Sequence, residues 1–221
     1  MPKVGVPEDV ALIRKEIRAA LKSTCDDNRK VGDSKFGVYA FYDYDGEPIY
    51  VGQTREQLRV RILRHLTNQR TDAVAMNVLD PFEVAEIEMW PFWELDGEDQ
   101  ETIASRLNSA EYTVFQNVLA KSKLGAVLNE KDINPTKKTK LPKSIRKRII
   151  PDSIYESRKH PDIRIARRAG TIANLAKVIS ERDVSPGLRR TLLTQARRLE
   201  RLASQRFDEF SDIPISTDGE E

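Results

Sequence analysis

Apolar residues recur every three or four positions in four stretches of the chain, which is the period of an amphipathic helix. These stretches are residues 7–21, 58–66, 97–121 and 162–206. Thr54 and Gln57 precede the second stretch with the spacing of a capping box, so we expect Thr54 to cap that helix. Ser185-Pro186-Gly187 interrupts the last stretch and predicts two helices there instead of one.

Three other stretches have the pattern of strands. Residues 36–42 and 49–51 are aromatic and apolar, and they flank Asp45-Gly46, a dipeptide typical of a tight turn, so they predict a β-hairpin. Residues 82–92 alternate apolar and acidic side chains, as a half-exposed strand does. The stretches expected to be loops, extended segments or short ambiguous elements are residues 22–34, 71–79, 123–134 and 135–151.

The order of these elements predicts an α/β (α+β) fold, in which helices flank a small antiparallel sheet. A length of 221 residues suits one domain with an extension. The expected parts are an N-terminal helix and loop (1–34), a core (35–134), a basic linker with a helical extension (135–210) and a disordered acidic tail (211–221).

Composition narrows the class of protein. No apolar run approaches the roughly 20 residues of a membrane span, and the N-terminus lacks the apolar segment of a secretory signal. Cys25 is the only cysteine, which excludes an internal disulfide and a zinc site built from several cysteines. We therefore expect a cytoplasmic protein without a membrane partner.

The net charge of +2 hides a segregation of charge along the chain. Residues 137–168 contain twelve Lys or Arg and three Asp or Glu, whereas residues 80–101 contain nine acids and no base. Residues 207–221 contain six acids and no base. A basic stretch held apart from acidic ones suggests a polyanionic partner such as nucleic acid, the alternative being solvated charge on helix surfaces.

Polar residues interrupt two of the apolar helix stripes. Arg61 and His65 lie one turn apart on the face of the 58–66 helix that should meet the sheet, and Glu111 lies inside the stripe of the long helix. A carboxylate there is costly unless it is paired, metal-bound or open to a cleft. A single glutamate suits Mg²⁺, an arginine suits a phosphate, and Tyr39, Tyr50 or His65 can take a proton from water. Together these groups are suited to hydrolysing a phosphodiester.

Two triplets and a helix motif carry a resemblance to a known family. Gly37-Val38-Tyr39 and Tyr50-Val51-Gly52 lie on the two arms of the expected hairpin, and "LRVRILRH" follows with Arg61 and His65. This pattern resembles the GIY-YIG nuclease family, whose name spells the two triplets. The resemblance extends to Glu111 in "SAEYTVF", at the place of the family's metal-binding glutamate.

The resemblance covers roughly residues 35–132 and ends near Asn129 in "GAVLNEKD", which matches the family's asparagine. Many relatives carry a lysine after the second triplet, where this chain has Gln53. The resemblance implies a Mg²⁺-dependent DNA endonuclease, with Mn²⁺ as a substitute and Glu111 as the metal ligand. The catalytic residues that it implies are Tyr39, Tyr50, Arg61, His65, Glu111 and Asn129.

Beside such a core, the basic stretch is expected to contact the backbone of double-stranded DNA. The expected DNA-binding residues are Gly52, Gln53, Lys137, Lys138, Lys140, Lys143, Arg146, Lys147 and Arg148. We expect a restriction-type enzyme, the alternatives being a structure-selective repair or recombination nuclease and an inactive DNA-binding protein. The oligomeric state stays open, with a homodimer as one option, as does the choice between Tyr39 and His65 as general base. Taken alone, the tyrosines could also be cross-strand packing residues.

Overall fold

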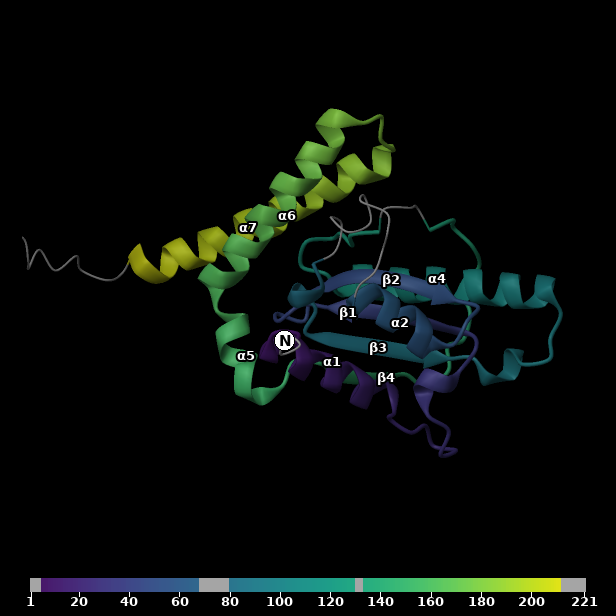
Figure 1. The fold of residues 1–221 in the computed structure, drawn as a ribbon. Coiled ribbons are helices and arrows are strands. Elements are labelled where there is room, and N and C mark those ends of the chain that lie inside the picture. Colours follow the sequence, from purple (N-terminus) through teal and green to yellow (C-terminus); the bar gives the residue numbers. More distant parts are fainter. Residues whose placement is uncertain (1–4, 68–79, 130–132, 212–221) are drawn as a thin grey trace, which may run out of the picture.

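A computed structural model describes residues 5–67, 80–129 and 133–211 (Figure 1). Its centre is an antiparallel four-stranded sheet with the strand order β2-β1-β3-β4, which confirms the expected fold class. The strands are β1 (Gly37–Tyr42), β2 (Pro48–Thr54), β3 (Glu86–Pro91) and β4 (Ile145–Arg148). The helices are α1 (Glu8–Leu21), α2 (Leu58–Thr67), α4 (Gln100–Lys121), α5 (Asp152–Lys159), α6 (Pro161–Glu181) and α7 (Pro186–Ser211). Short 3₁₀ helices are η1 (Val31–Asp33), η2 (Pro81–Glu83) and η3 (Trp93–Leu95).

Strand β1 is the centre of the core, and all six of its residues are buried. Its side chains alternate between the two faces of the sheet, as the period of a strand requires. Tyr39 and Phe41 belong to the apolar cluster that α1 and α2 cover, whereas Val38 and Ala40 belong to the cluster that α4 covers. The apolar stripes seen in the sequence therefore close the two faces of one sheet.

The hairpin extends further than its apolar pattern predicted. Strand β2 continues to Thr54, because that residue pairs with Gly37 at the start of β1. The expectation that Thr54 caps the next helix was wrong. Its hydroxyl accepts the Glu56 backbone N–H at 3.1 Å, and the carbonyl of Gln57 accepts the N–H of Arg61 at 3.2 Å, so Gln57 holds the cap position.

Strand β4 and helix α5 were not predicted. Residues 145–148 lie in the stretch expected to be a linker, and they pair with β3 so that Arg146 faces Glu88 and Arg148 faces Glu86. Strand β4 is basic and lacks the apolar alternation by which a strand is detected in a sequence. It is stabilised by cross-strand pairs with the acidic residues of β3. The domain boundary near residue 134 stays a prediction, although a strand beyond it completes the sheet.

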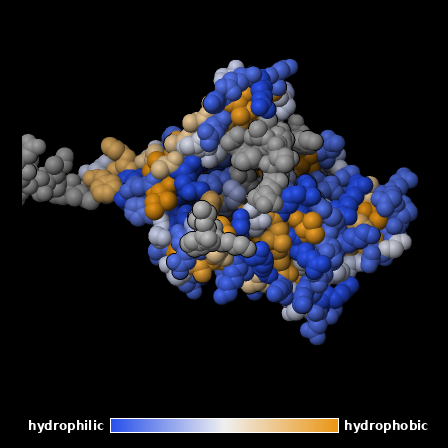
Figure 2. Space-filling model, viewed as in Figure 1, coloured by the Kyte–Doolittle hydropathy of each residue, from blue (hydrophilic) through white to orange (hydrophobic). Residues whose placement is uncertain are grey.

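Residues 182–185 separate α6 from α7, so the expected break at residues 185–187 lies where α7 begins, and the two helices pack together as a helical hairpin (Figure 1). Hydrophilic side chains dominate the face shown in Figure 2, and apolar Ile163, Phe207 and Phe210 are exposed on α6 and α7. Residues 71–79 and the tail after Ser211 lie outside the described residues. Among the residues described, no helix combines the length and apolar character that crossing a membrane requires.

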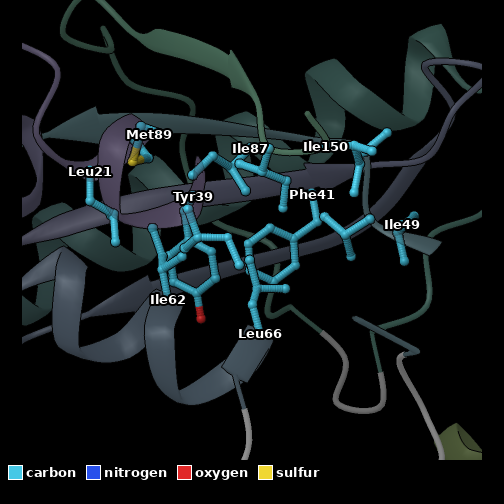
Figure 3. Packing of buried hydrophobic residues seen from close by; sticks show 14 of the residues in the cluster. Leu21, Tyr39, Phe41, Ile49, Ile62, Leu66, Ile87, Met89 and Ile150 are labelled. Atoms are coloured by element: carbon cyan, nitrogen blue, oxygen red, sulfur yellow. The ribbon is translucent and has the colours of Figure 1, made fainter. Parts of the chain in front are cut away.

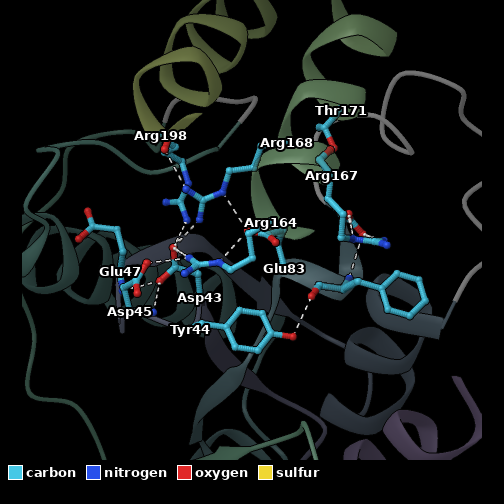
Figure 4. A network of polar contacts seen from close by, with 12 residues as sticks. Asp43, Tyr44, Asp45, Glu47, Glu83, Arg164, Arg167, Arg168, Thr171 and Arg198 are labelled. Atoms are coloured by element: carbon cyan, nitrogen blue, oxygen red, sulfur yellow. Dashed lines mark hydrogen bonds and ion pairs between the residues drawn. The ribbon is translucent and has the colours of Figure 1, made fainter. Parts of the chain in front are cut away.

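A buried ionic cluster attaches the α6–α7 hairpin to the turn between β1 and β2 (Figure 4). Asp43 Oδ2 accepts hydrogen bonds from Arg164, Arg168 and Arg198 at 3.3, 3.1 and 2.6 Å. All four side chains are buried, and Arg168 also donates to Glu83 at 2.9 Å. We call these five residues the Asp43 cluster. Buried charges are tolerated here because each has partners of opposite sign.

Candidate active site

Tyr39 places one hydroxyl inside an apolar cluster. Its ring is fully buried on β1 and lies among Phe41, Ile62 and Leu66 (Figure 3). The hydroxyl oxygen lies 3.1 Å from His65 Nε2. Arg61 Nε donates a hydrogen bond to the same oxygen at 3.3 Å. Arg61 and His65, which lie one turn apart on the helix, therefore both contact the Tyr39 hydroxyl.

The surroundings of Tyr39 favour its protonated form. Burial is the main cause that raises the pKa of Tyr39, and nearby Tyr50 raises it further. The charge of Arg61 and its hydrogen bond lower the pKa but do not outweigh burial. The phenol therefore keeps its proton at neutral pH unless a neighbour accepts that proton.

Gly52 creates the space into which the Tyr39 ring extends. It pairs with Tyr39 across the hairpin. A Cβ at this position would lie 2.7 Å from the Tyr39 hydroxyl oxygen and 2.8 Å from Tyr50 Cε1, closer than real Cβ contacts allow. Glycine is thus required because a phenol from the inner strand crosses the outer strand. A direct contact between Gly52 and DNA stays a prediction.

Tyr50 lies on the same face of the hairpin as Tyr39. The two ring centroids are 6.1 Å apart, and the Tyr50 ring lies 5.3 Å from the imidazole of His65. Tyr50 is partly buried, and its hydroxyl interacts with Arg61. Both tyrosines therefore contact the same two α2 side chains.

An open depression of about 510 Å³ adjoins these residues. Its lining residues are Gln53, Thr54, Arg55, Glu56 and Arg61. Arg61 therefore contacts Tyr39 and also borders space that a ligand can enter. A guanidinium with several N–H donors in this position is suited to a phosphate. A larger cavity of about 650 Å³, between residues 23–27 and 142–147, involves none of these side chains.

Glu111 approaches β2 from the opposite face of the sheet. Its carboxylate Oε2 accepts a hydrogen bond from Gln53 Nε2 at 2.9 Å, and the same nitrogen donates to Asn108 Oδ1 at 2.7 Å. Burial raises the pKa of Glu111, whereas the Gln53 hydrogen bond and the charge of Arg61 lower it. The fold thus holds a desolvated carboxylate whose charge is only partly compensated.

This carboxylate fits a hydrated divalent cation. No group of three or more His, Cys, Asp or Glu side chains suited to a metal occurs among the described residues. Mg²⁺ does not need such a group, because it commonly keeps several waters and binds one or two carboxylates together with substrate phosphate oxygens. Glu111 would supply the protein oxygen, and a cation beside it would relieve the cost of its charge.

The side-chain amide of Asn129 forms hydrogen bonds with the backbone of β2. Its Nδ2 donates to the Val51 carbonyl at 2.7 Å, and its Oδ1 accepts the Val51 N–H at 3.1 Å. Val51 stands between Tyr50 and Gly52. Asn129 therefore supports the strand that carries two of the expected site residues, and a direct catalytic contact stays a prediction.

The basic stretch is largely neutralised by partners within the chain. Seven of its twelve Lys and Arg residues form ion pairs: Lys143, Arg146, Arg148, Arg158, Arg164, Arg167 and Arg168. Several partners, such as Glu86 and Glu83, belong to the acidic stretch of residues 80–101. The charge segregation thus reflects, in large part, intramolecular pairing. Strand β4, with Arg146, Lys147 and Arg148, also lies at the sheet edge opposite to β2.

Three expected DNA-binding lysines lie in a different setting. Lys137, Lys138 and Lys140 are exposed, and no acid lies within ion-pair distance of them among the described residues. Their segment crosses α4, where the Thr139 N–H donates to Thr113 Oγ1 at 2.9 Å. Their role in binding DNA stays a prediction.

Sequence reasoning missed Asn108. It lies one helical turn before Glu111 and shares its face of α4, yet nothing in its type distinguishes it from an ordinary exposed residue. The spacing of three residues predicts that Asn108 lies close to Glu111 on the helix. Its contact with Gln53 was not, because that depends on how α4 packs against β2.

Comparison with known proteins supports the interpretation that the geometry suggests. Residues 35–110 match the family model of the GIY-YIG catalytic domain, a segment that contains Tyr39, Tyr50, Gly52, Arg61 and His65 and ends one residue before Glu111. Comparisons with curated proteins and with solved structures gave no match. Residues 35–110 of this chain therefore belong to the GIY-YIG nuclease superfamily.

Proposed function

We propose that this nuclease is a Mg²⁺-dependent, restriction-type endonuclease that hydrolyses phosphodiester bonds of double-stranded DNA. The observation that carries the proposal is the Tyr39 hydroxyl, held between Arg61 Nε and His65 Nε2 where Gly52 leaves space. Arg61 also borders the open depression where a phosphate would lie.

The contacts of Tyr39 support a proton relay. Arg61 donates to the phenol oxygen, so the phenol proton is free to point toward His65 Nε2. When a water attacks phosphorus, Tyr39 takes a proton from that water while its own proton passes to His65. This order is required because burial raises the pKa of Tyr39, which makes a preformed phenolate costly. The relay thus gives both residues a share in the role of general base.

The other groups hold and stabilise the phosphate. Arg61 uses its remaining N–H groups to bind the scissile phosphate, and Tyr50 orients the phosphate or the water. A cation at Glu111 would stabilise the negative charge that develops on the leaving oxygen. The new P–O bond forms to the water oxygen, the bond to the leaving oxygen breaks, and solvent protonates the leaving group.

Binding of the DNA backbone is assigned to the exposed lysines of residues 137–140. Ion pairs within the chain reduce the contribution expected from Lys143, Arg146 and Arg148. The restriction-type assignment is supported by the architecture, since the described residues form the core and a helical extension attached to it.

Plasmid digestion tests the proposal. The purified protein is incubated with several plasmids of different sequence in Mg²⁺, and Tyr39→Phe purified in the same way controls for contaminating nucleases. Discrete fragments that only the parent produces would support a restriction-type enzyme. Cleavage confined to branched or damaged DNA would replace that assignment with a structure-selective nuclease. Binding without cleavage in Mg²⁺ and Mn²⁺ would show an inactive DNA-binding protein.

A further inference from the structure

Gln53 links β2 to two residues of α4. Its Nε2 atom lies 2.7 Å from Asn108 Oδ1 and 2.9 Å from Glu111 Oε2, so one NH₂ group donates a hydrogen bond to each oxygen. Asn108 and Glu111 are three residues apart and therefore point in similar directions from the helix. Gln53 thus fills the space between two oxygens, where it can control the direction of the carboxylate.

The orientation of the Gln53 amide has a cost that these contacts explain. Its Oε1 atom is buried and has no hydrogen-bond partner among the described residues. A reversed amide would place that oxygen against Asn108 Oδ1 and Glu111 Oε2, and three acceptors would then face one another. The two α4 oxygens therefore select the orientation in which the nitrogen faces Glu111, although the Gln53 oxygen remains without a partner.

The link lies where the two halves of the site meet. The Tyr39 and Tyr50 side chains lie on the α2 face of the sheet together with Arg61 and His65, whereas Glu111 contacts β2 from the α4 face. Gln53 touches Glu111 and also lines the open depression together with Arg61. It is thus the β2 side chain that connects the carboxylate to the space where the phosphate would bind.

We propose that Gln53 and Asn108 are positioning residues, which hold the Glu111 carboxylate so that its second oxygen faces a divalent cation. This inference rests on the proposed function, because it assumes that Glu111 binds the metal. Gln53 donates to Oε2, and Asn108 holds Gln53 in the donating orientation. A neutral amide can do this without the repulsion that a cationic side chain would exert on the metal.

Metal binding without DNA tests the proposal apart from activity. Mn²⁺ is titrated into the full chain at pH 7 and its free concentration is followed by electron paramagnetic resonance. The site is defined as the binding that Glu111→Gln abolishes. Gln53→Ala should weaken that binding about 10- to 100-fold, the usual effect of removing a group that orients a metal ligand. Asn108→Ala should weaken it in the same direction, and Asn117→Ala, an exposed asparagine of the same helix, should leave it unchanged.

The pH dependence of binding separates positioning from simple support of the fold. Gln53 Nε2 donates to the Glu111 carboxylate and so favours its ionised form, and Gln53→Ala should therefore move the acid limit of Mn²⁺ binding to higher pH. Gln53→Lys keeps a donor and adds a charge, so it should move that limit to lower pH while weakening binding at neutral pH. Arg61, whose charge also acts on Glu111, is unchanged in both variants.

The outcomes distinguish this inference from the function on which it rests. Equal Mn²⁺ binding by the parent and Glu111→Gln would overturn the metal role of Glu111 and this inference with it. Loss in Glu111→Gln, with Gln53→Ala and Asn108→Ala both within about twofold of the parent, would overturn the positioning role alone. Melting temperature controls for folding, and Asn108→Ala keeps the test valid if Gln53→Ala unfolds, because Asn108 is exposed.

Discussion

The candidate active site and the Asp43 cluster both bury ionisable side chains, but the hydrogen-bond partners of these side chains differ. In the Asp43 cluster, one carboxylate oxygen accepts from three arginines and the other accepts the backbone N–H groups of Asp45 and Glu47. In the candidate active site, burial raises the pKa of Glu111, and among the described residues its carboxylate interacts with the side chain and the backbone of Gln53.

The difference separates structural from catalytic use of buried charge. A carboxylate with all its acceptor positions filled has no capacity left for a ligand, so the Asp43 cluster serves to attach the α6–α7 hairpin to the core. A partly satisfied carboxylate costs stability, which a ligand of opposite charge can restore. The difference therefore favours Glu111, and not the more buried Asp43, as the acid of the proposed metal site.

Removing the Tyr39 hydroxyl should produce the largest effect on activity. Tyr39→Phe should lower single-turnover cleavage about 10²- to 10⁴-fold, the usual range for the loss of proton transfer. Stability should fall by only about 1 kcal/mol for each of the two hydrogen bonds that the hydroxyl makes, to Arg61 and to His65. His65→Ala should match this loss of activity if the two residues form one relay.

Tyr42→Phe is the matched control for that loss, because Tyr42 lies on the same strand and donates to Glu88 at 2.7 Å on the opposite face. It should lose similar stability and keep full activity. A Tyr39→Phe protein that cuts like the parent would show that the two tyrosines are packing residues of the hairpin.

Removing the Asp43 carboxylate should have the reverse effect: it should lower stability and leave the cleavage activity of the folded protein unchanged. Asp43→Ala leaves buried arginines without their shared acceptor, so the free energy of unfolding should fall by about 3 to 5 kcal/mol. Thermal melting measures this loss, and cleavage per folded molecule should stay unchanged. Asp45→Ala removes a half-exposed partner of Arg164 and should cost far less. Equal melting temperatures for parent and Asp43→Ala would contradict the structural role of the cluster.

Unpaired and paired basic residues should differ in their effect on DNA affinity. Replacing Lys137, Lys138 and Lys140 by alanine should reduce the slope of log affinity against log salt by up to about 0.9 for each phosphate that these lysines neutralise. Arg146→Ala should change the slope little, because Arg146 already pairs with Glu86 at 2.6 Å. Filter binding over a series of salt concentrations measures both slopes, and equal slopes for all three proteins would argue against the lysine segment.

The smallest effect concerns stability without metal. Burial raises the pKa of Glu111 in the folded state, so ionising this carboxylate lowers the free energy of unfolding. This destabilisation is fully present above the pKa of the folded state and absent below the pKa of the unfolded state. Glu111→Gln removes this cost and should therefore raise the melting temperature at pH 7, by about 2 to 4 °C for each kcal/mol recovered. The gain should vanish as the pH falls below about 4. A lower melting temperature for Glu111→Gln at pH 7 would instead make Glu111 a structural residue like Asp43.

The sequence by itself determined most of the elements, though not β4 or α5, and most of the candidate site. Periodicity identified α1, α2, α4, the break before α7 and the hairpin, because burial on one face of an element repeats at that element's own period. The same rule exposed Arg61, His65 and Glu111 as polar residues on apolar faces, and the two tyrosines lay in recognisable triplets.

Only the tertiary structure decided which residues of different elements meet. The periodicity of one element does not show where that element lies relative to another. Three contacts between elements therefore could not be predicted: Tyr39 crossing Gly52, the Gln53–Asn108–Glu111 link, and the pairing of β4 with β3. The ion pairs of the basic stretch could not be predicted for the same reason, since several of its acidic partners lie elsewhere in the chain, and its role in binding DNA stays a prediction. A spacing fixes the face on which a side chain lies, but its partner depends on how whole elements pack.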